Sequence, residues 1–406
     1  PSIVKLLRMG GAAVQEQAAA ALAALHTDKG DAAAIKGGCI PPLVAMLRGA
    51  SAAAQAHSAQ ALANVADYSV EEGQNAIARA GAIPLLVTLL GSGRAQVPAA
   101  RALGKLVRGN GAIQAEVNDG GGIPPLLNLL NGLSTNAQVH AAEALSNVAR
   151  GNPANQALIA KAGGISPLLK LLEVKSHEAQ EQGASALAQL ACNNPANQAS
   201  IAAGCGGLFF LTALLSATTN VQRMAAFAIM EVCRADAANQ TDAGERGAIN
   251  ALVDQLKDGK STEAYEHVKA ESVGALWILS QDHAENKKAI ARAGGISQIV
   301  SLLASGTPRA QVHATEALAS IGFDNVSNQV EMTKQLVGLL STGAPEVKMR
   351  GAALLWRLVG ENPDSQREMA NAGSMSDLIG LLKDGNRSNR KYALWPLSLC
   401  IHACTR

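Results

Sequence analysis

The chain of 406 residues repeats itself with a period of about 42 residues. The repeat is plain when "NPANQALIAKAGGISPLLKLL", which begins at Asn152, is set against "NPANQASIAAGCGGLFFLTALL", which begins at Asn194. Asn155, Asn197 and Asn239 occupy one position of the repeat, each 42 residues after the one before. A period of this length is typical of proteins that stack one small helical unit on the next.

An Ala-rich segment in each repeat gives an independent test of the period. These segments read "ALANVA", "ALGKLV", "ALSNVA", "ALAQLA", "AIMEVC", "ALWILS", "ALASIG" and "LLWRLV". We call their fourth residues the ladder positions: Asn64, Lys105, Asn147, Gln189, Glu231, Ile278, Ser320 and Arg357. Successive ladder positions lie 41 or 42 residues apart, except for one gap of 47 and one of 37. We expect the long gap to lengthen a loop after Lys257 and the short gap to shorten a first helix after Gly322.

Composition fits helices that pack at close range. Hydrophobic residues make up 48% of the chain but aromatic residues only 2%, so the interior must be built from Ala, Leu, Ile and Val. Alanine favours helices and lets neighbouring helix backbones approach each other. A single compact core rarely extends over so many residues, whereas stacked repeats need only bury each apolar face against a neighbour.

Each repeat reads as a short polar helix, a glycine turn, an apolar second helix, a polar loop and a longer third helix. The turns carry the pairs Gly163-Gly164, Gly206-Gly207 and Gly294-Gly295, and glycine suits a corner that needs positive φ or close backbone approach. Pro42, Pro84, Pro125 and Pro167 fall near the start of the second helix, where a missing amide hydrogen costs little.

Three helices in about 42 residues, with "GGIPPLLNLL" followed by "AAEALSNVA", resemble the armadillo repeat of beta-catenin and importin alpha over nearly the whole chain. The resemblance implies an all-α, right-handed superhelical solenoid, a single domain over residues 1–406 with about nine to ten repeats. HEAT repeats are the nearest alternative, and the split first helix and Gly-Gly corner argue against them. Because the chain opens half-way through a repeat, we expect it to be a fragment of a longer protein.

The resemblance also implies that the third helices line a concave groove. Positions four and seven residues before each ladder position share its helix face. This stripe is mostly polar, which indicates contact with water or a partner. The predicted partner-binding residues are His57, Gln60, Asn64, Arg101, Lys105, His140, Glu143, Asn147, Ser185, Gln189, Met224, Phe227, Glu231, Glu271, Ile278, Glu316, Ser320 and Arg357. Pro98, in the same stripe, predicts a third helix that starts late or kinks.

In armadillo proteins that bind extended peptides, an Asn at the position of Asn64 and Asn147 hydrogen-bonds the peptide backbone. The importin Trp four residues earlier is absent, so we do not expect binding of nuclear-localisation peptides of the importin type. The side chains around Met224, Phe227 and Glu231 combine apolar groups with a carboxylate, which suits a partner with aliphatic and basic side chains. Phe227 is the predicted hot spot.

The net charge bears on the class of partner, and the cysteines bear on the compartment. Lys and Arg total 34 against 32 Asp and Glu, a net charge of +2, which gives no overall reason to bind nucleic acid or an anionic membrane. No stretch approaches the apolar length that spans a bilayer. Six scattered cysteines in apolar segments are typical of a reducing compartment, so we expect an intracellular protein, cytoplasmic or nuclear.

Several motifs have a plainer interpretation than a ligand site. "CIHAC" at the C-terminal end lacks the second half of a zinc pattern, and "DQLKDGKST" has no strand before it as a phosphate loop would. We expect solvated or hydrogen-bonding roles for the widely spaced His57, His140 and His313. Trp277, Trp356 and Trp395 are expected to pack between helices, and the basic run Arg387, Arg390 and Lys391 is expected to be a solvated face.

The sequence therefore predicts a protein-interaction scaffold or adaptor that binds an elongated peptide or helix of a partner protein. The alternatives are the substrate-recognition segment of a larger ubiquitin ligase and a nuclear transport adaptor. We expect no enzyme activity, cofactor or metal, because no nucleophile-base pair, carboxylate pair or ligand cluster stands out. The partner, the pathway and the oligomeric state stay open.

Overall fold

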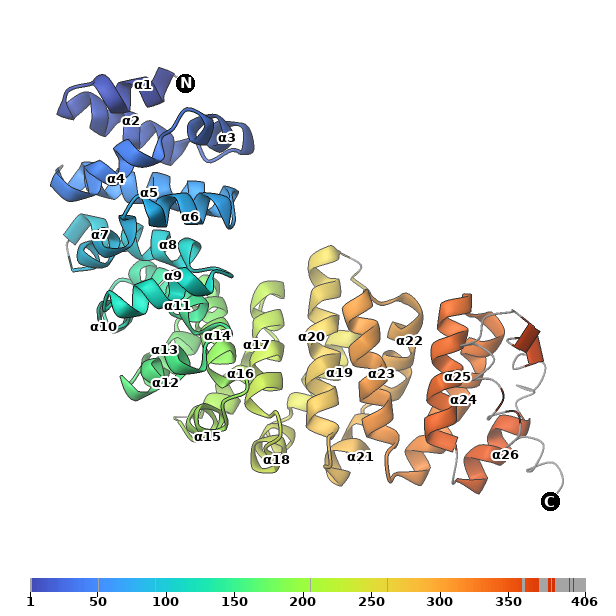
Figure 1. Ribbon diagram of the computed structural model, residues 1–406. Coiled ribbons are helices and arrows are strands. Elements are labelled where there is room, and N and C mark those ends of the chain that lie inside the picture. Colours follow the sequence, from blue (N-terminus) through green and yellow to red (C-terminus); the bar gives the residue numbers. More distant parts are fainter. Residues whose placement is uncertain are drawn as a thin grey trace. The chain divides into compact units, whose positions relative to one another are not determined.

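The computed structural model describes residues 2–49, 51–91, 93–204, 206–260, 262–359 and 362–371, with 379, 380, 382, 383, 394 and 397. These residues form 26 α-helices and one short 3-10 helix, and no strand occurs among them (Figure 1). The predicted all-α class is confirmed. The chain divides into two compact units, Pro1–Cys205 and Gly206–Arg406, which we call unit 1 and unit 2.

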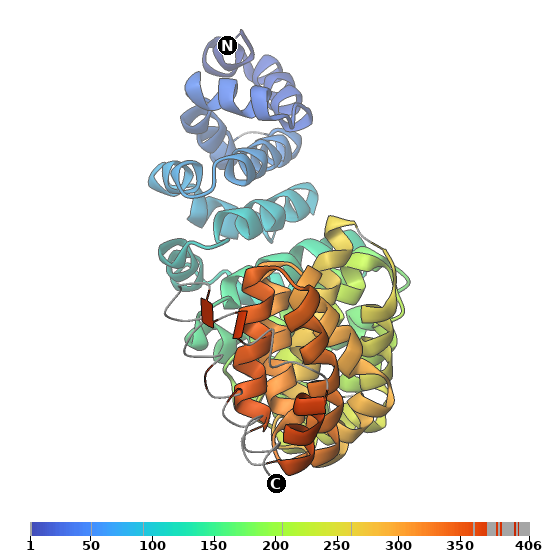
Figure 2. The same cartoon turned by 90° about the vertical axis from the view of Figure 1, so that its right-hand side faces the viewer.

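Unit 1 opens with the second and third helices of an incomplete repeat, α1 (Ser2–Met9) and α2 (Ala12–Ala24). Four three-helix repeats and one further first helix follow: α3 (Asp28–Lys36), α4 (Ile40–Gly49), α5 (Ala52–Tyr68); α6 (Glu72–Arg79), α7 (Ala82–Leu89), α8 (Gln96–Leu106); α9 (Gly111–Asp119), α10 (Ile123–Leu130), α11 (Thr135–Ala149); α12 (Pro153–Lys161), α13 (Ile165–Glu173), α14 (His177–Ala191); α15 (Pro195–Ala203). Figure 2 shows the helices from a second side.

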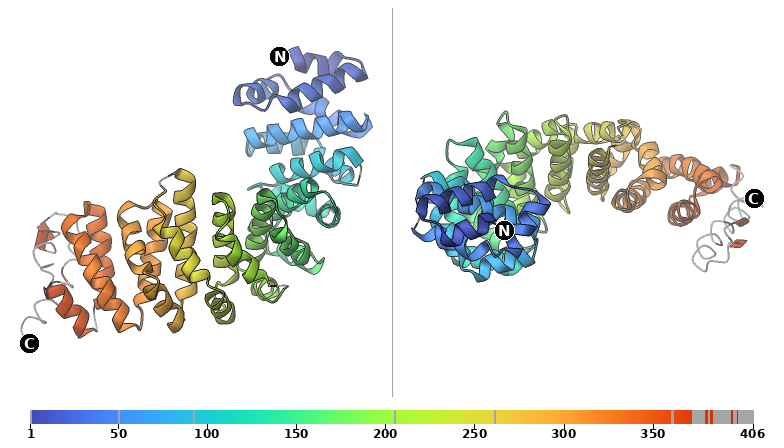
Figure 3. Two further views of the ribbon diagram at one scale, coloured as in Figure 1. Left: turned by 180° about the vertical axis from the view of Figure 1, so that it is seen from behind. Right: turned by 90° about the horizontal axis from the view of Figure 1, so that it is seen from above.

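Unit 2 continues the pattern, with α17, α20, α23 and α25 as third helices. Its helices are α16 (Gly207–Leu214), α17 (Thr219–Val232); α18 (Ala237–Glu245), α19 (Ala248–Lys257), α20 (Glu263–Ser280); α21 (Ala284–Arg292), α22 (Gly295–Ser305), α23 (Pro308–Gly322); α24 (Val326–Thr342), α25 (Pro345–Val359); α26 (Pro363–Asn371). Within this unit α17, α20 and α23 lie side by side, as Figure 1 and the rear view in Figure 3 show.

The glycine corners have the backbone geometry that the sequence predicts. Gly163, after α12, has a φ of 81°, a left-handed value that a side chain would strain. A Cβ on Gly164 would lie 2.9 Å from the carbonyl oxygen of Ile159, so this position needs glycine for close approach. Pro167 lies in the first turn of α13, where the helix needs no amide hydrogen.

The core of each unit consists of small aliphatic side chains from facing helices. On α8, Ala99 and Ala100 are fully buried, and so are Ala141 and Ala142 on the neighbouring third helix α11. Small residues at these positions let the third helices pack closely. The interior is therefore aliphatic, as the low aromatic content predicts.

A buried Asn-Gln pair fixes the first helix α12 in the stack. Asn155 on α12 donates from Nδ2 to the carbonyl of Val148 on the third helix before it, at 3.0 Å. Gln156 donates from Nε2 to the carbonyls of Gln189 and Cys192 at the end of its own third helix, at 2.9 and 3.2 Å. The repeated asparagine seen in the sequence thus has a structural role, because it satisfies buried backbone carbonyls between repeats.

The two irregular gaps arise differently from what we expected. The long gap does not only lengthen a loop, since α20 has 18 residues where α17 has 14. The short gap does not shorten a first helix: α24 is one helix of 17 residues that takes the place of both the first and the second helix. No glycine pair interrupts it near Met332, and without a corner the helix continues.

Pro98 confirms a late helix start. The 3-10 turn Gly93–Ala95 precedes α8, which begins at Gln96. Pro98 therefore lies in the first turn of the α-helix, where no intrahelical bond is lost.

Candidate functional site

The third helices of unit 1 present a regular grid of polar side chains. The ladder position and the residue four before it supply Gln60 and Asn64 on α5, Arg101 and Lys105 on α8, and Glu143 and Asn147 on α11. The sequence did not predict a further row: Asp67, Arg108 and Arg150 lie three residues after a ladder position, and His26 has the same register one repeat earlier. Its signal was available, since these residues recur at the same 41- to 42-residue spacing. We call the grid and this row together the charged face of unit 1.

The asparagines of the ladder are already engaged within the protein. Asn64 is 2% exposed, donates to the carbonyl of Ala23 at 2.9 Å and accepts from Gln60 Nε2 at 3.1 Å. Asn147 donates to the carbonyl of Gly104 at 3.1 Å. Their amide hydrogens join neighbouring third helices, so these side chains brace the face that a partner would meet.

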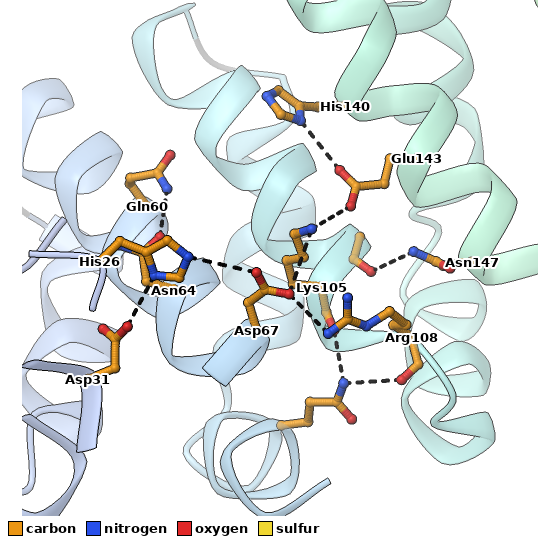
Figure 4. Close-up of polar contacts among 12 residues, drawn as sticks. His26, Asp31, Gln60, Asn64, Asp67, Lys105, Arg108, His140, Glu143 and Asn147 are labelled. Atoms are coloured by element: carbon orange, nitrogen blue, oxygen red, sulfur yellow. Dashed lines mark hydrogen bonds and ion pairs between the residues drawn. The ribbon is translucent and has the colours of Figure 1, made fainter. Parts of the chain in front are cut away.

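An ion-pair network crosses the charged face from α5 to α11 (Figure 4). Lys105 Nζ lies 2.8 Å from Glu143 Oε1 and 3.7 Å from Asp67 Oδ1. Arg108 donates to Asp67 at 2.9 Å, and His26 lies between Asp67 and Asp31, at 3.8 and 3.1 Å. The carboxylates of Asp67 and Glu143 thus form ion pairs with cations from neighbouring repeats.

Glu143 is the most strongly stabilised anion of this network. Burial alone would raise its pKa, but the nearby His140 imidazole, 3.6 Å away, and the Lys105 ammonium outweigh burial and lower the pKa to about 2. The carboxylate therefore stays ionised at all physiological pH values. Burial has the opposite outcome at Asp31, whose pKa is raised despite the hydrogen bond with His26.

The other predicted residues of unit 1 contribute little charge. Gln189 is buried, while His57 is half-buried. Ser185 is half-buried and shares a 3.1 Å hydrogen bond with Ser146 of α11.

In unit 2 the predicted carboxylates of Glu231 and Glu271 are buried and paired. Glu231, 4% exposed, accepts two hydrogen bonds from Arg234, at 3.2 and 2.8 Å. Glu271 is 5% exposed and lies 2.9 Å from Arg309. Burial raises the pKa of Glu271 in spite of that arginine. The Glu271–Arg309 pair joins α20 to α23, and both carboxylates are poorly placed to receive a partner's cation.

The predicted partner-binding stripe is wrong on α20, because its residues are buried there. Ile278 is fully buried, so it cannot contact a partner from this position. Gly274, at the stripe position before it, is packed so tightly that a Cβ would lie 2.7 Å from His313 Nδ1. Met224 and Phe227 on α17 remain half-buried, and each keeps part of its surface open.

A pocket of about 610 Å³ opens in unit 2 among the ends of the third helices. Trp277 of α20 and Phe323, just after α23, supply its aromatic walls. The predicted residues Glu316, Ser320 and Arg357 also line it. We expected Trp277 to be a packing residue, yet it is only partly buried and faces this pocket. Its position directly before the ladder residue Ile278 is the sequence signal for this location.

Lys287 lies in the same pocket, at the register that Gln114, Gln156 and Gln240 occupy in other repeats. Its ammonium donates to the carbonyl of Phe323 at 2.7 Å and lies 5.2 Å from the ring centre of Phe323. Lys287 is 5% exposed, and burial lowers its pKa. The Lys287 ammonium thus donates to a backbone carbonyl, as the buried glutamine amides do in other repeats.

Among the described residues no group of His, Cys, Asp or Glu has the arrangement of a metal site, and none of the helices described is long and apolar enough to cross a membrane. "CIHAC", Trp395 and the run Arg387, Arg390 and Lys391 lie outside the described residues. Cys39 and Cys233 are buried free thiols.

No family model and no curated protein matches the chain. Among solved structures, one engineered protein is 30% identical, with a TM-score of 0.82 and 98% of both chains covered. Another engineered protein is 31% identical, with a TM-score of 0.54, and covers 59% of this chain and 96% of its own. A designed armadillo repeat protein in complex with the peptide (KR)4 is 27% identical, with a TM-score of 0.52, and covers 59% of this chain and 99% of its own. The three-helix repeat and these similarities together show that the chain has the armadillo repeat fold.

Proposed function

We propose that this protein is an interaction scaffold that binds an extended segment of a partner protein across its third helices. The observation that carries the proposal is the pocket beside Trp277, which adjoins the ladder positions Ser320 and Arg357. A partly exposed Trp at the edge of a pocket is a common anchor for a side chain of a bound peptide. The similarity to a designed armadillo protein that is solved with a peptide supports the same use of the fold.

The peptide that fits this chain differs from a purely basic one. The (KR)4 peptide of the designed relative is cationic, whereas the charged face of unit 1 carries Arg101, Lys105, Arg108 and Arg150. In unit 2, the buried Glu231 and Glu271 already have arginine partners. We therefore propose a partner of mixed sequence, with an apolar or aromatic side chain directed to Trp277. An intracellular location, which the buried free thiols of Cys39 and Cys233 suit, is part of the proposal.

A peptide library displayed on phage, selected against the intact chain, tests the proposal. We expect the selected peptides to change the fluorescence of Trp277 when they bind. Trp277→Ala should weaken their binding about tenfold or more. Phe209→Ala is the matched control, because Phe209 is an aromatic residue of the same unit that is 54% exposed on the second helix α16. Failure to select any peptide, or equal affinity for the Trp277 variant and the control, would refute a peptide site at this pocket.

A further inference from the structure

The charged face of unit 1 carries more positive than negative charge. Arg101 and Lys105 are four residues apart on one face of α8, and Arg108 follows the C-terminal end of that helix. Arg150 follows the end of the neighbouring third helix α11 at the register of Arg108. The carboxylates among them are those of Asp67 and Glu143.

Those two carboxylates are used by two of the four cations. Glu143 lies 2.8 Å from Lys105, and Asp67 lies 2.9 Å from Arg108. Arg101 and Arg150 make no ion pair or side-chain hydrogen bond with any described residue. Two guanidinium groups on this face therefore keep all their donors available.

The backbone beneath the arginine row is held in place. Gln74 donates to the carbonyl of Arg108 at 3.1 Å, and Gln114 donates to the carbonyl of Arg150 at 3.1 Å. Both glutamines are buried, at 1% and 5% exposed. The two arginines thus extend from fixed points on adjacent repeats, and repulsion from Arg108 adds to burial in lowering the pKa of Arg150. Like charges held near each other favour an anion between them.

We propose that Arg108 and Arg150 together bind an acidic side chain, Asp or Glu, of the extended partner segment, and that Arg101 binds a second one. The inference rests on the proposed function and assigns it a chemical class. Guanidinium groups suit this task because their planar donors match the two oxygens of a carboxylate. Adjacent helices pack about 8–10 Å apart, while an extended chain advances about 3.3 Å per residue, so acidic residues two or three apart match the face.

Fluorescence anisotropy on the intact chain tests the inference with three labelled peptides of equal length, in which Ala alternates with Glu, Gln or Lys. At low ionic strength we expect the Glu peptide to bind at least about tenfold more tightly than the Gln peptide, and the Lys peptide to bind least. Arg150→Gln should weaken the Glu peptide about tenfold, the loss expected for one charge-assisted contact. Arg101→Gln should weaken it by a similar factor.

Arg48→Gln is the matched control, because Arg48 is an exposed arginine of unit 1 on the second helix α4. Its affinity for the Glu peptide should match that of the unmodified chain. Circular dichroism should show all three variants folded, since none of these side chains makes an ion pair or a hydrogen bond with a described residue.

The outcomes separate the two proposals. If library peptides bind through Trp277 while the Glu peptide shows no preference over the Gln peptide, or is unaffected by Arg150→Gln, the acidic-segment inference is overturned and the scaffold function stands. If a single-stranded oligonucleotide binds more tightly than the Glu peptide and depends on Arg150, the face recognises nucleic acid and the inference is also wrong. If no peptide of any kind binds, both proposals fail.

Discussion

The side-chain amide of Asn147 donates to the backbone carbonyl of Gly104, 3.1 Å away on the preceding third helix. The residue that the family resemblance assigns to peptide binding thus also joins two repeats. Asn64 makes the equivalent bond to Ala23. Ladder asparagines in this chain therefore contribute to stability before any partner is bound.

Asn147→Ala should destabilise unit 1 by about 1–2 kcal/mol, because the buried carbonyl of Gly104 loses its donor. Asn128→Ala is the control: Asn128 is exposed on α10 and should change stability by less than about 0.5 kcal/mol. All three tryptophans lie in unit 2, so hydrogen exchange of peptides from α8 and α11 is the suitable measurement. Equal protection in both variants would show that the bond contributes nothing.

Lys287→Gln should stabilise unit 2 at neutral pH by about 0.5–1 kcal/mol. The lowered pKa of Lys287 means that folding disfavours its charged form, so the cost is present at neutral pH and is relieved as pH rises toward the unfolded-state value. A glutamine, as at Gln240, can donate to a carbonyl without that cost. Lys287→Met lacks a donor and should be about 1 kcal/mol less stable than the glutamine variant. Urea titrations followed by tryptophan fluorescence would show the order; a methionine variant at least as stable as the glutamine variant would contradict it.

Glu143 should make unit 1 sensitive to acid. Because its folded-state pKa is about 2, against an ordinary value of 4.5, its contribution is complete above pH 4.5 and is lost as pH falls toward 2. The contribution is on the order of 2 kcal/mol. Glu143→Gln should lower protection of α8 and α11 above pH 4.5 and flatten the change below it. Identical pH profiles for the variant and the unmodified chain would count against the network.

Gly274→Ala should destabilise unit 2 by about 1–3 kcal/mol, since the added methyl group would meet His313 at 2.7 Å and Met230 Sδ at 2.9 Å. Gly338→Ala provides the opposite control. A Cβ at Gly338, inside α24, has open space around it, so alanine should stabilise that helix by about 0.5–1 kcal/mol. Thermal unfolding monitored by circular dichroism would distinguish the two, and a neutral Gly274 variant would mean that α20 and α23 can separate slightly.

The sequence predicted the repeat well because period and punctuation depend on local residues. Gly163 needs its positive φ, and Pro98 needs a first turn, whatever surrounds them. The sequence did not predict that the first and second helices merge into α24. A repeat that is five residues short fits a shortened first helix as well as two merged helices, and the missing glycine pair alone does not distinguish them.

The functional face was predicted less completely. Helix spacing indicates the direction of a side chain but not how deeply neighbouring helices bury it. Ile278 and Glu231 lie on the predicted helix face, yet they are buried because neighbouring helices pack against them. The row of Arg108 and Arg150 lies just beyond the helix ends, where helical spacing no longer fixes the direction of a side chain. Ion pairs such as Lys105 with Glu143 join residues 38 positions apart and depend on how repeats stack.

The buried Asn-Gln pairs also determine how the chain would come apart. Since Asn155 bonds to the repeat before it and Gln156 to the end of its own third helix, disorder in one repeat is transmitted first to its immediate neighbours. A partner clamped on a few adjacent third helices would therefore slow hydrogen exchange locally and leave distant repeats to fray from their ends as before.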